Sequence, residues 1–241
     1  MKITFVGSSH GVPEPHRQCS CTMIEVAGNT YFVDMGTCAI NALRTRNIPV
    51  DSVKGIFLTH MHGDHSDGLI QFVDLLTWFF RSAEPIICLP IIEAAKLIES
   101  WIQITQIPLY RSLQYRETVE GTVFDDGIIK VTAIPTQHCP KSFSYVVEAE
   151  GKAVLFTGDL RNPSYDFALK NLDKHFDLVV CESAHFNATD YLPYLDEKKV
   201  DKVCINHYSD LFLPSVFSLF EQLKQTNIST VLAMDDLEIR I

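Results

Sequence analysis

Five short apolar segments of this chain each run into an aspartate or a histidine. These residues are Asp34 after TYFV, His60 after GIFLT, His138 after VTAIPTQ, Asp159 after AVLFTG and His207 after KVCIN. Short apolar runs that end in turn residues predict buried β-strands. Functional groups of layered α/β folds gather in the loops at the carboxyl ends of strands. The five side chains therefore fall at the same structural place.

The remaining pattern predicts two strand-rich halves, each followed by helices. Strands are expected at 2–7, 21–28, 29–36, 53–60, 127–136, 142–151, 152–159, 176–183, 202–207 and 229–234, with a two-residue Gly28–Asn29 turn in an antiparallel N-terminal meander. Helices are expected at 38–47, 67–80, 91–104, 163–172 and 214–226. Such halves predict an α+β fold in which two sheets carry helices outside them, an αββα four-layer sandwich. The long apolar runs fit sheets that are covered on both faces.

Composition predicts one soluble domain. The 241 residues contain no linker, repeat or low-complexity tract, so we expect a single hydrolase-like domain over 1–241. No signal peptide or run of 18 apolar residues is present, which predicts a cytoplasmic protein without a membrane segment. Seven scattered cysteines fit reduced thiols. The net charge of −10 argues against strong binding of nucleic acid.

The stretch LTHMHGDHSDGL, residues 58–69, contains the densest group of candidate functional side chains. It places His60, His62, Asp64 and His65 within one turn. Imidazole and carboxylate together suit zinc and neighbouring divalent metals. Three imidazoles and a carboxylate cannot all serve one ion without strain, but alternate residues can divide between two ions. We expect Gly63 to allow backbone angles that a side chain would forbid.

The same stretch resembles a known motif. THMHGDH is similar to the H-x-H-x-D-H motif of the metallo-β-lactamase-fold hydrolases. FVDMG, TQH, LFTGD and INHYS resemble the remaining motifs of that family in their usual order, so the resemblance extends from about residue 3 to residue 208. It implies the αββα sandwich that the strand and helix pattern predicts.

The resemblance also implies a division of ligands between two divalent metal ions, zinc in the first place, with manganese or iron as alternatives. One ion would be held by His60, His62 and His138, the other by Asp64, His65 and His207, with Asp159 between them. Asp34 would orient a ligand histidine. Two ions roughly 3.5–4 Å apart make a hydroxide available at neutral pH from a shared water. Hydrolysis is the expected reaction.

Within that family the chain resembles the ribonuclease Z and phosphodiesterase branch. The features that carry this are Gly63 and the segments VGSSHGVPEP, DLVVCESAHF and NHYSD. Ribonuclease Z carries a long insertion that grips tRNA between the positions of His138 and Asp159, which are only 21 residues apart here. We therefore expect a small or cyclic phosphodiester as the substrate. A carboxylic ester or lactone, tRNA 3′ processing and a non-enzymatic sensor are the alternatives.

A second departure concerns the proton donor. The histidine that protonates the leaving group in that branch is replaced by Cys181, although Glu182 is kept. His185 could take over with Glu182 fixing its tautomer, and His10 is the rival. A substrate with an acidic leaving group would need neither. Asp64, Glu182, His185 and His10 are thus the candidate catalytic residues.

Three further features have two interpretations each. Cys19 and Cys21 form a C-x-C pair that could contribute to an extra metal site, although plain thiols are the simpler expectation. The segment LLTWFF at 75–80 could line a substrate cleft or a homodimer face, and DLFLPSVFSLF at 210–220 could lie at an interface. We expect both to be core, because helices that are apolar all round usually pack inside a protein.

Overall fold

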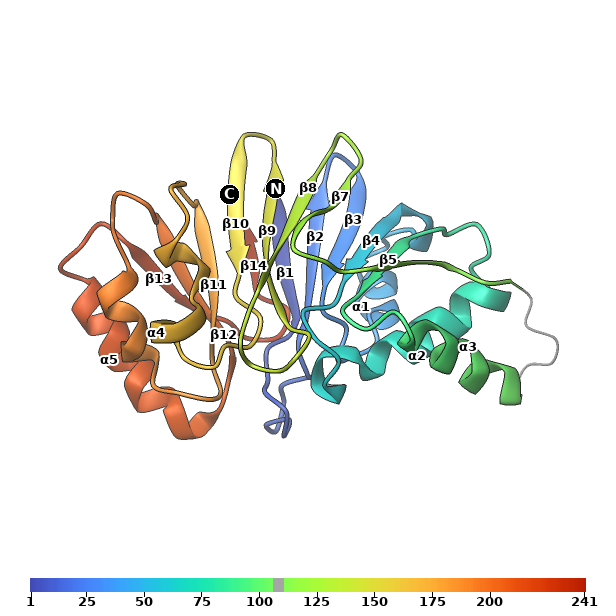
Figure 1. Cartoon of the computed structure of the whole chain (residues 1–241), viewed down its shortest axis with the longest axis horizontal. Helices are drawn as coiled ribbons and strands as arrows, with labels where there is room; N and C mark the ends of the chain where they lie inside the picture. Colours follow the sequence, from blue (N-terminus) through green and yellow to red (C-terminus); the bar gives the residue numbers. More distant parts are fainter. Residues whose placement is uncertain (106–110) are drawn as a thin grey trace.

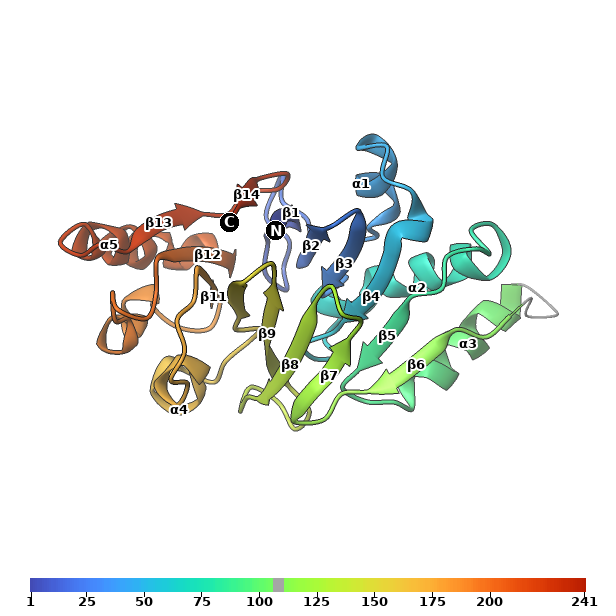
Figure 2. The ribbon, with the colours of Figure 1, turned by 90° about the horizontal axis from the view of Figure 1, so that it is seen from above.

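The computed structural model describes residues 1–105 and 111–241. Two seven-stranded sheets lie against each other in the middle of the molecule. Helices α4 and α5 lie at one end, and α1, α2 and α3 lie at the other (Figures 1 and 2). This arrangement is the predicted αββα sandwich. None of the helices in the described part of the chain is long and apolar enough to cross a membrane.

The first sheet has the strand order β14-β1-β2-β3-β4-β5-β6. Its strands are β1 (Lys2–Gly7), β2 (Cys21–Val26), β3 (Asn29–Val33), β4 (Val53–Phe57), β5 (Ile86–Leu89), β6 (Gln114–Glu117) and β14 (Glu238–Arg240). The pairs from β14 to β3 are antiparallel, and those from β3 to β6 are parallel. Parallel neighbours need crossover connections. The helices that supply these connections are α1 (Ile40–Thr45), α2 (Gly63–Trp78) and α3 (Ala94–Thr105), with a 3-10 turn η1 (Val50–Ser52).

The second sheet repeats this plan with the order β13-β12-β11-β10-β9-β8-β7. Its strands are β7 (Gly121–Asp125), β8 (Lys130–Pro135), β9 (Phe143–Ala149), β10 (Lys152–Phe156), β11 (Leu178–Ser183), β12 (Lys202–Tyr208) and β13 (Ser229–Leu232). Strands β7 to β10 are antiparallel and β10 to β13 are parallel. Its outer layer consists of α4 (Pro163–Asp166), η2 (Ala168–Lys170), η3 (Ala188–Tyr194), η4 (Asp210–Phe212) and α5 (Leu213–Leu223).

Three apolar layers hold the four structural layers together. The central one contains buried side chains from both sheets, among them Phe5, Phe57, Val131, Tyr145 and Val180. A second lies between the first sheet and helices α1 to α3, and a third between the second sheet and the α4–α5 layer. Inner strands are therefore buried on both faces, which is why their apolar runs exceed simple alternation.

The structure differs from the sequence-based expectations at several element boundaries. The N-terminal turn consists of Ala27 and Gly28, with φ of 49° and 80°, one residue earlier than expected. The helix expected at 163–172 is broken after Asp166, because Phe167 takes an extended conformation and is buried in the third apolar layer. Strands β5, β6, β7 and β14 escaped prediction. They are short, and the last three lie at sheet edges, where little apolar patterning is needed.

The two apolar segments are only partly core. Leu76 in α2 is fully buried, but Trp78 and Phe79 that follow it are 41% and 62% exposed. In the second segment Val216 and Leu219 are buried, whereas Leu211 and Phe217 are exposed. The expectation of core was therefore wrong for two large apolar residues of each segment, because helices at the outer layers bury only one face.

Candidate metal centre

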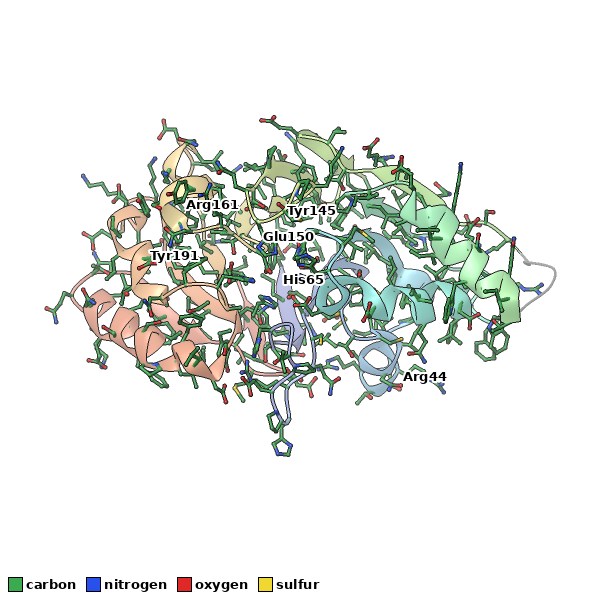
Figure 3. The ribbon with its side chains drawn as sticks, turned by 60° about the horizontal axis from the view of Figure 1, so that its bottom comes forward. Arg44, His65, Tyr145, Glu150, Arg161 and Tyr191 are labelled. Atoms are coloured by element: carbon green, nitrogen blue, oxygen red, sulfur yellow. The ribbon has the colours of Figure 1, made fainter. Side chains whose placement is uncertain are left out.

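The predicted ligands and Asp34, which is predicted to orient one of them, meet at one edge of the two sheets, at the carboxyl ends of strands. Asp34 follows β3, His60 follows β4, His138 follows β8, Asp159 follows β10, and His207 lies near the end of β12. In Figure 3, His65 lies near the centre of the molecule, between the layer that contains Tyr191 and the helix that contains Arg44. The first sheet thus contributes one side of the cluster and the second sheet the other.

The loop after β4 and the start of α2 bring four predicted ligands to one place, namely His60, His62, Asp64 and His65. The amide of Phe143 in β9 donates to the carbonyl of Thr59, which ties this loop to the second sheet. His62 is the N-cap of α2, and Asp64 and His65 lie in its first turn. Four candidate ligands therefore share one rigid strand-to-helix connection.

Gly63 serves a different purpose from the one expected. It is the first residue of α2 and has an ordinary helical backbone, so the expectation of unusual backbone angles was wrong. A Cβ at this position would lie 2.8 Å from a carboxylate oxygen of Asp67. The glycine provides space beside that carboxylate.

Asp159 faces two different groups of histidines with its two oxygens. Its Oδ1 lies 3.4 Å from Nε2 of His65 and 3.3 Å from Nε2 of His207. Its Oδ2 lies 3.7 Å from Nε2 of His60 and 3.6 Å from Nε2 of His138. One buried carboxylate therefore stands between two sets of ring nitrogens.

Each set is compact enough to share an ion. In the first, Nδ1 of His62 lies 3.0 Å from Nε2 of His60 and 3.2 Å from Nε2 of His138. In the second, Oδ2 of Asp64 lies 3.5 Å from Nε2 of His65 and 3.7 Å from Nε2 of His207. The ligand atoms of each set all lie within 4.8 Å of one another. Nitrogen and carboxylate donors at this spacing can bind divalent metals.

Two buried atoms and the charges around them indicate that a cation fits here. Nε2 of His65 and Oδ1 of Asp159 have no hydrogen-bond partner within the described part of the chain, and buried polar groups rarely lack one. Burial lowers the pKa of His60 to about 2, which leaves the neutral imidazole that binds metals. Burial also disfavours a charged His65, but Asp159, Asp34 and Asp64 raise its pKa to about 10. The carboxylates therefore favour positive charge at this position.

Two further groups fix the orientation of His65 and His207. Nδ1 of His65 donates to Oδ2 of Asp34 at 2.7 Å, and Asp34 also accepts from the amide of Thr59. Nδ1 of His207 donates to the carbonyl of Ser9 at 3.0 Å. Both imidazoles thus present Nε2 toward Asp159. Asp34 and His207 have φ of 59° and 49°, a backbone region that is rare outside glycine and is concentrated at functional sites.

The candidate proton donors lie in different surroundings. Nδ1 of His185 lies 2.9 Å from Oε2 of Glu182, and this hydrogen bond raises the pKa of His185 to about 9. Its Nε2 lies 3.8 Å from Oδ2 of Asp159, so the ring borders the cluster. Cys181 is buried in the third apolar layer, away from solvent. His10 pairs with Glu14 at 3.1 Å.

The comparison with protein families identifies the group. The model of the family described as Anti-Pycsar protein Apyc1 matches residues 1–225. The chain belongs to the Apyc1 family. Its resemblance to the metallo-β-lactamase-fold hydrolases of the ribonuclease Z and phosphodiesterase branch is confirmed by the relatives described next.

This Apyc1-family chain is 24% identical over 176 residues to a protein named Ribonuclease Z from Mycolicibacterium paratuberculosis, a match that covers 66% of the chain and 62% of that protein. The chain spans about half to three fifths of the length of the curated relatives that it matches. Human tRNase Z, short form, superposes with a TM-score of 0.78 at 19% identity over 100% of this chain and 99% of that one. A diphosphatase from the PhnP family gives 0.67 at 17% identity, over 100% and 97%. These two structures show the fold.

Several groups that support the site in this Apyc1-family chain could not be predicted from the sequence. The carbonyl of Ser9 is a backbone atom, so no residue type marks it. Thr59 binds both oxygens of Asp34 through its hydroxyl, yet it occupies an ordinary strand-end position in the sequence. Within the described residues, the groups of acidic, histidine and cysteine side chains close enough to share an ion include neither Cys19 nor Cys21.

Proposed function

We propose that this Apyc1-family protein is a metal-dependent phosphodiesterase that hydrolyses a small or cyclic phosphodiester at a two-metal site. The observation that carries the proposal is the position of Asp159, whose two oxygens face two separate sets of ligands. A curated relative and a structural neighbour are named as a ribonuclease and a diphosphatase, both of which act on phosphate groups. We infer that this chemistry extends to the present chain.

The residues divide between the two proposed ions as the geometry groups them. One ion would be held by His60, His62 and His138, the other by Asp64, His65 and His207, and Asp159 would touch both. Two divalent ions, for which we propose zinc with manganese or iron as alternatives, would supply an activated water and offset the negative charge that develops on the oxygens of the attacked phosphate. Asp34 and the carbonyl of Ser9 hold the rings of His65 and His207 in the orientation that this requires.

We propose His185 as the group that protonates the leaving oxygen. Because Glu182 holds Nδ1 of this histidine, Nε2 is directed toward Asp159 and His138. A proton on Nε2 could therefore pass to an oxygen that leaves at the border of the cluster. The burial of Cys181 in the third apolar layer argues against this role for its thiol.

The connection between His138 and Asp159 is short, and this favours a small substrate. Only residues 136–142 separate β8 from β9, and a tight turn with positive φ at Glu150 and Gly151 joins β9 to β10. The stretch therefore contains two strands and no arm that could grip a large molecule. The net charge of −10 also disfavours a polyanionic substrate.

A substrate panel tests the proposal. Purified protein, with its metal content measured, is assayed with bis(p-nitrophenyl) phosphate, a p-nitrophenyl ester and a set of lactones. We expect close to two metal equivalents and the fastest turnover with the phosphodiester. Loss of this activity in His207→Ala, purified in the same way, excludes a contaminating enzyme. Faster hydrolysis of an ester or lactone would favour that alternative, and two bound ions without any hydrolysis would favour a sensor.

Processing of tRNA 3′ ends is the second candidate, because a curated relative is named Ribonuclease Z. The absence of an arm between His138 and Asp159 argues against it. We expect no efficient removal of a 3′ trailer from precursor tRNA, even at low salt, where electrostatic binding is strongest. Accurate cleavage after the discriminator base at physiological enzyme levels would reverse the order of the two candidates.

A further inference from the structure

Arg17 is a buried cation that contacts none of the predicted ligands directly. Its side chain is 4% exposed, and its guanidinium carbon lies 3.9 Å from the centroid of the Tyr208 ring. Nη1 donates to the carbonyl of Ser8 at 3.1 Å, and both Nη atoms donate to the carbonyl of Tyr208 at 3.2 Å. Nη2 also donates to Oδ1 of Asp210 at 2.8 Å. A single side chain thus joins the loop after β1 to the end of β12.

These contacts lie on both sides of the hydrogen bond that orients His207. The acceptor of that bond is the carbonyl of Ser9, next to Ser8, and its donor is His207, next to Tyr208. Ser9 also forms isolated β-bridges with Tyr208 and Cys19, so the loop runs directly beside the end of β12. Arg17 therefore links the two backbone segments whose separation decides whether the bond to His207 can form.

The conformation of His207 makes such a link necessary. Its φ of 49° is one that residues other than glycine rarely adopt, so surrounding bonds must hold it. The same loop approaches a second predicted ligand: a Cβ on Gly11 would lie 3.3 Å from Oδ2 of Asp64. The loop is thus in position to constrain two of the three residues in the Asp64, His65 and His207 set.

The choice of arginine fits positioning better than general stabilisation. Burying a charge is costly, and Asp210, its ion-pair partner, is itself largely exposed. The planar guanidinium can serve two carbonyls and a carboxylate in fixed directions while stacking on an aromatic ring, which lysine cannot do. The geometry, rather than the charge, is what this position requires.

We propose that Arg17 is a positioning residue for the metal site formed by Asp64, His65 and His207. It holds the loop of residues 8–17 against the end of β12, and so keeps the imidazole of His207 directed at Asp159. This inference rests on the proposed function, because it takes His207 as a ligand.

The test measures metal binding directly. Wild type, Arg17→Met, Arg17→Lys, His207→Ala and Arg46→Met are equilibrated with buffered zinc, and the zinc equivalents and affinities are determined by competition with a chromophoric chelator. Arg46 is the matched control, since it pairs with Asp236 at the surface and also donates to a backbone carbonyl. We expect one ion of Arg17→Met to bind at least about tenfold more weakly, with the other unchanged. Arg46→Met should match wild type, and Arg17→Lys should lose part of the affinity.

The outcomes separate the two proposals. Two ions with wild-type affinities in folded Arg17→Met would overturn the positioning role. If that variant fails to fold by circular dichroism, Arg17→Lys decides, and wild-type affinities in it would likewise overturn the role. If wild type binds neither zinc nor, in the same assay, manganese or iron, or if His207→Ala binds zinc as wild type does, the proposed two-metal function fails instead.

Discussion

The two sets of predicted ligands differ in how they are held. In the buried half, formed by Asp64, His65 and His207, both imidazoles are almost inaccessible, and each Nδ1 donates to an oxygen outside the cluster. In the open half, formed by His60, His62 and His138, two of the rings are partly exposed, and ring nitrogens face one another. His185 borders the open half, with its ring 4.8 Å from that of His138. We infer that one ion site is preorganised and the other is adaptable, nearer to solvent and to the proton donor.

Removal of Asp159 should have the largest effect, because this residue belongs to both halves. In Asp159→Ala we expect the loss of bound metal and a fall in phosphodiester hydrolysis of at least about 10³-fold. Metal analysis and steady-state kinetics on the same preparation check this. Asp126→Ala, which removes a carboxylate that binds Tyr31 at a distance from the centre, serves as the control. Full activity in Asp159→Ala would end the shared role of this carboxylate.

His185→Ala should affect catalysis without affecting either half as a metal site. We expect an alkyl phosphodiester to be hydrolysed at least about 10²-fold more slowly, because general acid catalysis typically contributes that much or more. A substrate with a nitrophenolate leaving group should hardly respond, since it needs no proton. Both rates and the metal content are measured in His185→Ala and in His10→Ala. An equal response of the two substrates, or a difference confined to His10→Ala, would show that His185 is the wrong donor.

Asp34→Ala should separate the two halves of the centre. The carboxylate bonds directly to Nδ1 of His65, whereas it reaches His60 only through the hydroxyl of Thr59. We therefore expect the ion of the buried half to bind about 10–100-fold more weakly, with a smaller change in the open half. A two-step chelator titration reads the two affinities independently. Equal losses in both halves would mean that Asp34 supports the whole loop after β4 through Thr59, rather than one ligand.

The sequence predicted the ligands of both halves better than the groups that support them. His60, His62, Asp64 and His65 were evident because they lie close together in one strand-to-helix connection, and the remaining ligands because each follows an apolar strand. Of the supports, only Asp34 was expected, from the resemblance. The others were not evident: His207 is oriented by a backbone carbonyl, and Arg17 reaches Tyr208 across 191 positions of the chain. Contacts of that separation leave no local pattern. The role of Gly63 was missed for a different reason: it depends on the conformation of the Asp67 side chain, four residues along the same helix, and residue type alone does not reveal this.

Prediction of the fold from the sequence was limited in a similar way, by contacts between distant parts of the chain. The inner strands could be predicted because burial on both faces demands long apolar runs. The edge strands β6 and β14 carry mostly polar residues, and their place in the sheet depends on partners far away in sequence. The break at Phe167 similarly reflects tertiary packing of one aromatic ring, which overrides a locally helical pattern.

The smallest expected effect is a difference in the rate at which the two ions leave. Because His62 and His138 are partly exposed and the buried half is closed by Asp34 and Ser9, excess chelator should remove the two ions in two phases. We expect rates that differ several-fold to about tenfold, the lower range of what such outer contacts contribute to metal affinity. His62→Ala should abolish the fast phase and His207→Ala the slow one, as followed by stopped-flow absorbance of the chelator. A single phase in wild type, or the reverse assignment in the variants, would show that burial and hydrogen bonding do not distinguish the two sites, and the contrast between the halves would then be one of geometry alone.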